Sequence, residues 1–129
     1  MIQLTMKQLA SDLQFSLRKT QRIYKYLDLH YEKQGKKVIF YLSERLTNSI
    51  QLSKQYNIPP LLSIPDIAAN FEHIYSSQLI SYSNQTVHSI IKRLNLAVKI
   101  NAKLYIYLSD LYNLRQNSQI HINKEDSNG

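Results

Sequence analysis

The spacing of apolar and polar residues predicts two short helices near the start of the chain. Residues 5–13 (TMKQLASDL) place apolar side chains on one helical face, and Thr5 and Gln8 have the spacing of a capping box. Residues 16–27 (SLRKTQRIYKYL) show the same spacing, and Ser16 stands where an N-cap residue belongs. The predicted apolar face of this second helix consists of Leu17, Thr20, Ile23, Tyr24 and Leu27.

The second predicted helix carries its polar residues on a face of its own. Turned away from the apolar positions are Arg18, Lys19, Gln21, Arg22 and Lys25. The tight connection Gln14-Phe15 joins this helix to the one before it, and in a helix-turn-helix the second helix reads DNA. A helix with one buried face and a row of cations and amides opposite suits the DNA major groove. Solvated surface helices also carry Lys and Arg, so this segment alone leaves both interpretations open.

A basic hairpin and a third helix are predicted to follow. Gly35 lies in the polar run EKQGKK, ahead of the β-branched and aromatic run VIFYL, a pattern typical of a hairpin tip and its return strand. Three lysines would cluster at this tip: Lys33, Lys36 and Lys37. A basic hairpin beside a helix-turn-helix is the wing of a winged-helix domain, although a solvated hairpin tip has the same composition. Ser43 then caps a helix over Glu44–Tyr56, which ends before Pro59 because proline cannot continue a helix.

The same order of patterns recurs in the second half of the chain. Three blocks align in cap, polar and apolar character: Thr5–Leu13 with Ser63–Phe71, Ser16–Leu29 with Ser83–Leu96, and Lys37–Leu46 with Lys103–Tyr112. Gly35 aligns with Asn101, and both residue types tolerate positive φ. The second copy has about nine extra residues around Glu72–Ser81. Self-similarity over three separate blocks indicates an internal duplication.

We therefore predict a mainly α fold with small β-hairpins, made of two tandem winged helix-turn-helix units packed as an internal pseudo-dimer. Either half alone would be marginally stable at its size, which favours packing of one half on the other. The expected boundaries are 1–57 for the first unit, 58–62 for a linker, 63–116 for the second unit and 117–129 for a polar, disordered tail.

Composition narrows the class of partner. The 129 residues hold 16 Lys and Arg against 9 Asp and Glu, and the net charge of +7 favours a polyanion such as nucleic acid or an acidic membrane surface. Residues 1–57 hold 10 basic and 4 acidic side chains, whereas residues 58–129 hold 6 and 5. The lack of cysteine excludes disulfides and zinc–thiolate sites. No apolar run approaches the ~20 residues of a membrane span, so we expect a cytoplasmic protein without a membrane partner.

Catalysis is not expected from this sequence. The four histidines (His30, His73, His88 and His121) show no metal-ligand spacing, and no Ser/His/Asp or paired-carboxylate constellation stands out. The chain has 2 glycines, which argues against a glycine-rich phosphate loop. We therefore predict that the protein is not an enzyme and holds no cofactor or metal.

The order helix, turn, helix, basic hairpin and strand–Ser–acid–helix resembles the winged-helix DNA-binding domain of the MerR and phage excisionase families. Two such units in a small basic protein resemble the TraN-like DNA-binding proteins of Gram-positive conjugative plasmids. The resemblance covers residues 4–56 and 63–115 and implies binding of double-stranded DNA near a transfer origin or promoter. Other transfer or relaxosome proteins are further implied partners. The matching positions are Arg18, Lys19, Arg22, Lys25, Lys33, Lys36 and Lys37 in the first unit and Asn84, Gln85, His88, Lys92, Lys99 and Lys103 in the second.

The two halves are expected to read different base patterns. Arg18 and Arg22 suit guanine, and the amides of Asn84 and Gln85 suit adenine. A monomer with a built-in duplication should bind two half-sites about 34 Å apart, one helical turn. A transcriptional repressor or an excisionase-like architectural protein is the alternative role. A more distant alternative is an adaptor that docks a partner protein through the second unit or the Glu72–Ser81 insertion, whose apolar residues (Ile74, Tyr75, Leu79 and Ile80) could equally pack into the core.

Overall fold

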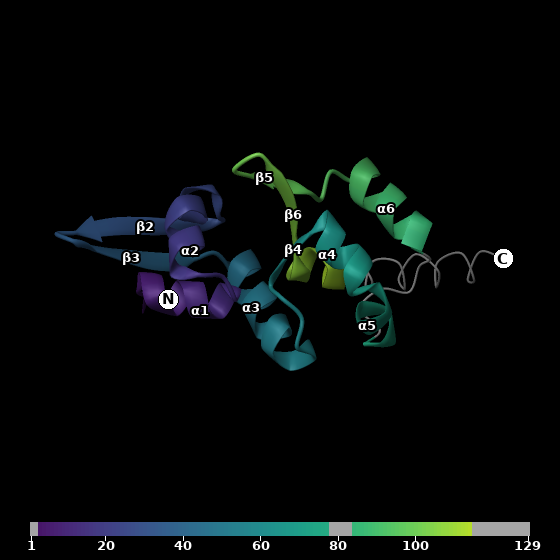
Figure 1. The fold of residues 1–129 in the computed structure, drawn as a ribbon, viewed down its shortest axis with the longest axis horizontal. Helices are drawn as coiled ribbons and strands as arrows, with labels where there is room; N and C mark the ends of the chain where they lie inside the picture. Colours follow the sequence, from purple (N-terminus) through teal and green to yellow (C-terminus); the bar gives the residue numbers. More distant parts are fainter. Residues whose placement is uncertain (1–2, 78–83, 115–129) are drawn as a thin grey trace.

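The first half of the chain folds into a three-stranded sheet with helices packed on one face. The computed structural model describes residues 3–77 and 84–114 (Figure 1). We call its part up to residue 57 the first unit. In chain order it contains β1 (Gln3–Leu4), α1 (Met6–Leu13), α2 (Leu17–Ile23), the 3₁₀ helix η1 (Tyr24–Tyr26), β2 (Leu29–Gln34), β3 (Lys37–Leu42) and α3 (Glu44–Tyr56). The strands are antiparallel in the order β1-β3-β2.

The second unit, from residue 58 to residue 114, repeats this order with one extra helix. It contains β4 (Leu61–Ser63), α4 (Ile64–Ala69), α5 (Phe71–Ser76), α6 (Asn84–Arg93), β5 (Val98–Ile100), β6 (Lys103–Tyr107) and the helical residues 108–114. Its sheet has the equivalent order β4-β6-β5. Both predicted hairpins are present, and each gains a third strand that the sequence analysis did not predict. The extra helix α5 falls in the predicted insertion, whereas residues 78–83 and the tail 117–129 lie outside the described residues.

The helix starts follow the predicted caps. The Thr5 hydroxyl accepts the backbone N–H of Gln8 (3.3 Å), and the Gln8 side chain accepts the backbone N–H of Thr5 (2.9 Å). Ser63 and Asp66 form the same reciprocal pair at the start of α4. Gln14 ends α1 in the left-handed conformation, with a φ of 61°, and so turns the chain toward α2. The capping box predicted for the first helix is confirmed, and the second copy preserves it.

The second helix is shorter than predicted. It ends at Ile23, and the chain continues as the 3₁₀ helix η1. This tighter turn keeps Tyr24 in the core, where its ring meets two other aromatic rings edge-on at 5.0 and 5.3 Å. The prediction that Leu17 is buried was wrong. Leu17 is 40% exposed because the helix enters the core only from Thr20 onward.

The second sheet lies between two hydrophobic cores. Leu62 and Ile106 belong to the core of the second unit. Leu61, Tyr105 and Tyr107, the neighbours of these residues along the strands, belong to the core of the first unit. Successive side chains of a strand point to opposite faces, so each unit covers one face of this sheet. Both faces of the second sheet are therefore buried.

Residues 58–62, which the sequence analysis treats as a linker, contribute to these cores. β4 begins at Leu61, and the side chains of Ile58, Leu61 and Leu62 are at most 1% exposed. The backbone N–H of Leu108 donates to the carbonyl of Pro60 (2.9 Å). The two units are thus joined through packed residues, because the apolar side chains of this segment face both cores.

The first sheet keeps its outer face open. This face carries Gln3, Glu32 and Gln34, and all three side chains are exposed. The residues that occupy the equivalent register positions in the second sheet are apolar: Leu61, Val98 and Ile100. The second copy therefore replaces three polar side chains by apolar ones on the face that the first unit covers, and their burial stabilises the contact.

Contacts between the units are one-sided. The hydroxyl of Tyr107 accepts the backbone N–H of Asp28 in the first unit (2.9 Å). Tyr41, its counterpart in the first sheet, bonds within its own sheet to Gln3 (3.4 Å) and Glu32 (3.5 Å). In a symmetric dimer each contact occurs twice, with the two partners exchanged. The predicted internal pseudo-dimer is therefore an arrangement in series, with the outer sheet face of the second unit packed on the first unit.

Candidate nucleic-acid interface

The helix α2 is anchored on one face and exposes polar side chains on the other. The Ser16 hydroxyl caps it by accepting the backbone N–H of Lys19 (3.1 Å), and Ile23 is buried in the core. Thr20 is fully buried and donates its hydroxyl to the carbonyl of Ser16 (2.9 Å), so the burial leaves no unpaired hydroxyl. The opposite face and the following turn expose Arg18, Gln21, Arg22 and Lys25, as predicted.

Lys19 differs from these residues because its side chain lies across the boundary between the units. The sequence analysis turned it toward solvent, but the residue is half-buried. Its Nζ lies 4.1 Å from the centre of the Phe15 ring and 5.4 Å from the centre of the Tyr105 ring in β6. Phe15 itself meets Tyr105 edge-on at 6.3 Å. The Nζ of Lys103 lies 5.7 Å from the centre of the same Tyr105 ring. Cations from both units thus meet at one aromatic ring.

Both hairpins present lysines near their tips. In the first hairpin Gly35 has a φ of 64°, as the tight turn requires, and the exposed residues around it are Lys33, Lys36 and Lys37. In the second hairpin Asn101 and Ala102 make the turn with φ values of 49° and 69°. Lys99 and Lys103 are exposed on the two strands beside this turn.

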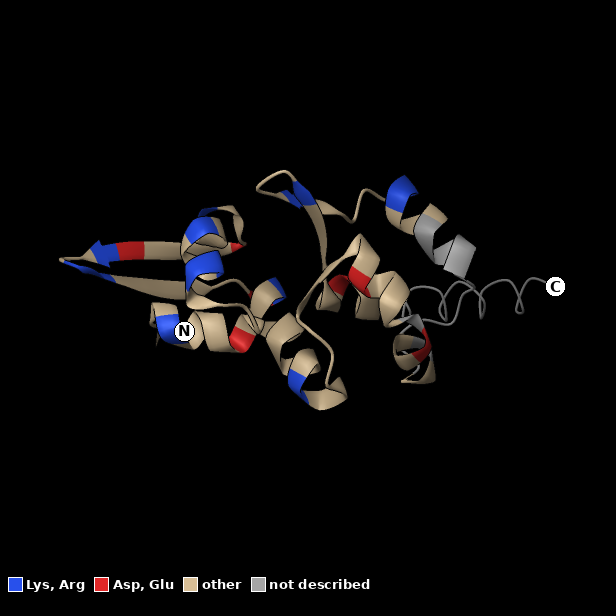
Figure 2. Ribbon diagram, in the orientation of Figure 1, with Lys and Arg blue, Asp and Glu red and all other residues tan. Residues whose placement is uncertain are grey.

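The predicted residues of α6 are described in part. Lys92 lies exposed in the last turn, next to Arg93. Asn84, Gln85 and His88 belong to the helix, but their side chains lie outside the described residues. In Figure 2, basic positions of α2, of the β5–β6 hairpin and of the C-terminal end of α6 lie along the upper edge of the molecule. The fold therefore brings cations from distant parts of the sequence to one side.

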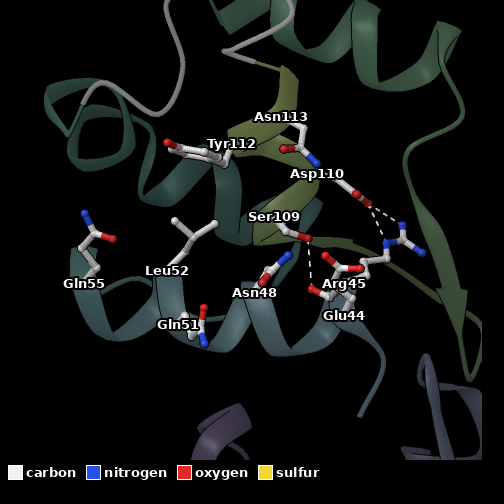
Figure 3. A pocket seen from close by; sticks show the side chains of 10 residues that line it. All are labelled: Glu44, Arg45, Asn48, Gln51, Leu52, Gln55, Ser109, Asp110, Tyr112 and Asn113. Atoms are coloured by element: carbon white, nitrogen blue, oxygen red, sulfur yellow. Dashed lines mark hydrogen bonds and ion pairs between the residues drawn. The ribbon is translucent and has the colours of Figure 1, made fainter. Parts of the chain in front are cut away.

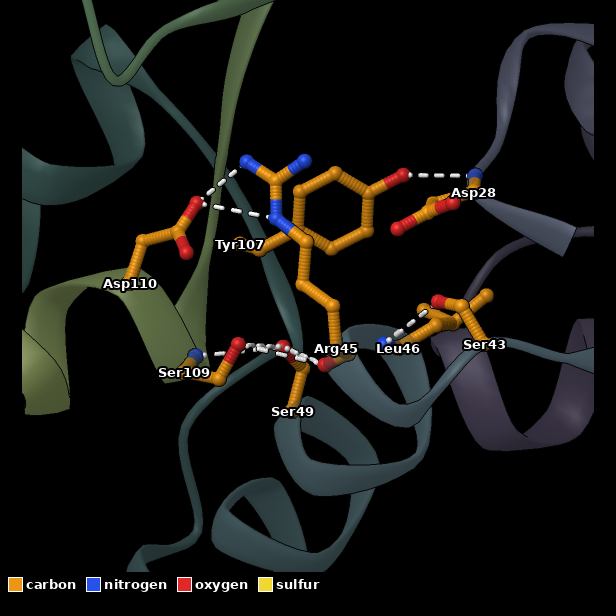
Figure 4. A network of polar contacts seen from close by, with 8 residues as sticks. All are labelled: Asp28, Ser43, Arg45, Leu46, Ser49, Tyr107, Ser109 and Asp110. Atoms are coloured by element: carbon orange, nitrogen blue, oxygen red, sulfur yellow. Dashed lines mark hydrogen bonds and ion pairs between the residues drawn. The ribbon is translucent and has the colours of Figure 1, made fainter.

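A polar network holds the second unit against the first (Figure 4). Arg45 of α3 lies over the Tyr107 ring, 4.2 Å from its centre, and forms an ion pair with Asp110. The Ser49 hydroxyl accepts the backbone N–H of Ser109 (3.1 Å). The Ser109 hydroxyl donates to the carbonyl of Arg45 (3.1 Å). Because these contacts join α3 to the end of β6 and the helix after it, they fix the second hairpin relative to α2.

Burial and neighbouring charges shift two pKa values in this network. Burial raises the pKa of the Tyr107 hydroxyl, and the bond from the Asp28 N–H and the charge of Arg45 offset only part of the increase. Burial alone would lower the pKa of the Arg45 guanidinium, but its bond to Asp110 and the charge of that carboxylate outweigh the effect, so this pKa is raised. Tyr107 is therefore neutral and Arg45 charged at neutral pH.

Two grooves open beside α3. One, of about 460 Å³, lies between α3 and the helical residues 108–114, where Leu52 and Tyr112 face each other among amide and acidic side chains (Figure 3). The other, of about 820 Å³, lies between α3 and the first sheet, and its lining includes Leu4, Leu42 and Ile50. None of the residues predicted to bind DNA lines either groove.

The sequence analysis did not assign Phe15 or Tyr105 to the basic surface. It placed Phe15 at the corner between two helices and Tyr105 in a half-buried strand. Comparison of the two copies holds a signal that was not used, because Ile39 on the outer face of the first sheet is replaced by Tyr105 in the second. A ring at this position can contact Phe15 and two lysines, which an isoleucine cannot do through a π system.

Within residues 3–77 and 84–114, no three His, Asp or Glu side chains gather where they could hold a metal ion. No helix in the same part of the chain is long and apolar enough to cross a membrane. Comparison of the chain with protein-family models, with curated proteins and with solved structures finds no match.

Proposed function

We propose that the protein binds double-stranded DNA in a sequence-specific manner and that each of its units acts as a winged helix. The observation that supports this most directly is the surface of α2. This helix is anchored by its buried face and exposes Arg18, Gln21 and Arg22, and it contains no acidic residue. A helix of this kind suits a major groove. The two lysine-bearing hairpins extend beside it (Figure 1), where they suit the flanking phosphates.

The chemistry divides between base and backbone contacts. Arg18 and Arg22 are one helical turn apart, and each guanidinium can donate two hydrogen bonds to guanine O6 and N7. Lysines pair with phosphates and release condensed counterions, so affinity should fall steeply as salt rises. The second unit would add a further reading surface on α6, where the sequence places Asn84 and Gln85, and would make the binding site bipartite.

We further propose an accessory or regulatory role in conjugative plasmid transfer, with other transfer or relaxosome proteins as partners. The support is the resemblance of the tandem units to TraN-like proteins. A transcriptional repressor or an excisionase-like architectural protein would use the same contacts, because one fold serves several roles. The position of the bound sequence, beside a nick site or beside a promoter, distinguishes these roles.

The test begins with selection from a random duplex pool, followed by sequencing of the bound fraction. Fluorescence anisotropy with the enriched duplex then compares the wild-type chain with the double variant Arg18→Glu/Arg22→Glu. Loss of two bidentate arginine contacts should weaken binding by at least about 30-fold, since each contributes roughly 1–3 kcal/mol. The matched control is Lys7→Glu/Lys54→Glu, which changes the net charge by the same amount at exposed positions of α1 and α3.

The control should weaken binding by less than about 3-fold, because it changes only the long-range field. Absence of any enriched duplex, or equal losses in both double variants, would overturn the proposal. In either case an adaptor role, with a partner protein docked on the second unit, becomes the first candidate.

A further inference from the structure

We propose that Lys19 and Lys103 bind one stretch of DNA backbone together, at the boundary between the two units. This inference rests on the proposed DNA binding and adds to it a contact that neither unit can form alone. It differs from the expectation drawn from the sequence, in which each unit holds its own half-site with its own helix and hairpin.

The geometry of Tyr105 carries the inference. Its ring is 4% exposed and lies near both ammonium groups, at 5.4 Å from Lys19 Nζ and 5.7 Å from Lys103 Nζ. Neither lysine forms an ion pair with any carboxylate of the described residues. Two cations held near one ring repel each other unless an anion lies close to both. A phosphodiester is an anion that fits this demand on a DNA-binding surface.

The strand register separates Lys103 from the other lysine of its hairpin. Lys103 lies two residues before Tyr105, on the face of β6 that packs on the first unit. Lys99 pairs with Leu104 instead, so it lies on the opposite face of the hairpin. Lys103 is therefore the lysine of the second hairpin that faces α2. Lys99 provides a control with the same charge on the same hairpin.

The position of the pair is fixed by packed residues. Phe15 contacts both Lys19 and Tyr105, and the Arg45–Asp110 ion pair holds the two units together next to Tyr107. Arg18 and Arg22 lie on the exposed face of the helix that carries Lys19. A DNA strand that follows the basic edge from α2 to the second hairpin would therefore cross this pair.

The experiment is a double-mutant cycle on the full chain with the selected duplex, measured by fluorescence anisotropy over a series of salt concentrations. The variants are Lys19→Met, Lys103→Met and their combination, since methionine keeps an unbranched stem and removes the charge. We expect Lys103→Met to lower the slope of log affinity against log salt by about 0.9, the value for one phosphate contact. We expect its effect on affinity to be at least about 3-fold smaller in the Lys19→Met background, because residues that share one partner couple.

Lys99→Met combined with Lys19→Met is the matched cycle and should be additive. Lys54→Met controls for the loss of one positive charge elsewhere. The inference is overturned if Lys103→Met behaves like Lys54→Met, or if the effects of Lys19→Met and Lys103→Met simply add. These results leave the proposed function standing as long as the wild-type chain binds the duplex and Arg18→Glu/Arg22→Glu does not. Failure of the wild-type chain to bind any duplex overturns both proposals.

Discussion

Replacement of Tyr107 by phenylalanine tests whether the two units fold as one body. The hydroxyl of Tyr107 is the acceptor for the backbone N–H of Asp28, at 2.9 Å, and joins β6 to the chain just after η1. The side chain is 1% exposed, so water has little access to the donor once the hydroxyl is removed. The variant keeps the ring, its burial and its contact with Arg45, and therefore isolates this one hydrogen bond.

The expected loss follows from the unpaired donor that remains. A buried N–H without an acceptor costs about 1–3 kcal/mol in the free energy of unfolding. Unfolding entropy of about 2.1 cal/mol/K per residue converts this loss into a fall in Tm of about 4–11 °C for a chain of this length. Because β6 contributes to both cores, the transition should stay single and cooperative.

The assay is thermal unfolding at pH 7, followed by far-UV circular dichroism, with Tyr41→Phe as the matched control. Tyr41 occupies the equivalent position in the first sheet, but its hydroxyl bonds only to the exposed Gln3 and Glu32 side chains at 3.4 and 3.5 Å. Its loss should change Tm by less than about 2 °C, since surface substitutions are usually within ±0.5 kcal/mol. Equal effects of Tyr107→Phe and Tyr41→Phe, or two separate transitions in the wild-type chain, would refute the reasoning.

Two further predictions concern pH and the first hairpin. The pKa of Tyr107 is raised in the folded state, so its contribution to stability is complete below the unfolded pKa of about 10 and is lost as pH rises above it; urea denaturation at pH 8 and pH 10.5 should show a smaller loss for Tyr107→Phe than for the wild-type chain. Gly35→Ala should destabilise by about 1–2 kcal/mol, because φ is +64° and no neighbour lies within 4 Å of the added Cβ. Gly35→Asn should destabilise less in the same denaturation experiment, since Asn101 adopts positive φ in the equivalent turn; an equal loss for both variants would contradict the conformational explanation.

Local signals predicted much of the fold because they act over a few residues. The capping box of Thr5 and Gln8 and the cap at Ser43 place α1 and α3, and Gly35 places the first hairpin turn. Each of these features depends on hydrogen bonds or backbone angles set by neighbours in sequence. The alignment of the two copies then extends the same elements to the second half of the chain.

The features that were missed depend on contacts between distant residues. β1 and β4 are short strands that exist because β3 and β6 pair with them, so no local pattern defines them. The exposure of Leu17 and the half-buried position of Lys19 depend on where α2 meets the core and the second unit. Periodicity assigns a residue to a face of a helix, but it does not say what covers that face.

The differences between the two copies carry information that either copy alone lacks. Outer-face positions that are polar in the first sheet are apolar in the second, and only the second sheet is covered on that face. A two-fold arrangement would require the same residue types on both copies, because each would meet the same surface. The series arrangement instead gives the chain two unlike ends and no two-fold axis. Inverted-repeat sites mirror a two-fold axis in the protein, so a duplex bound by these units should be asymmetric and held in one orientation.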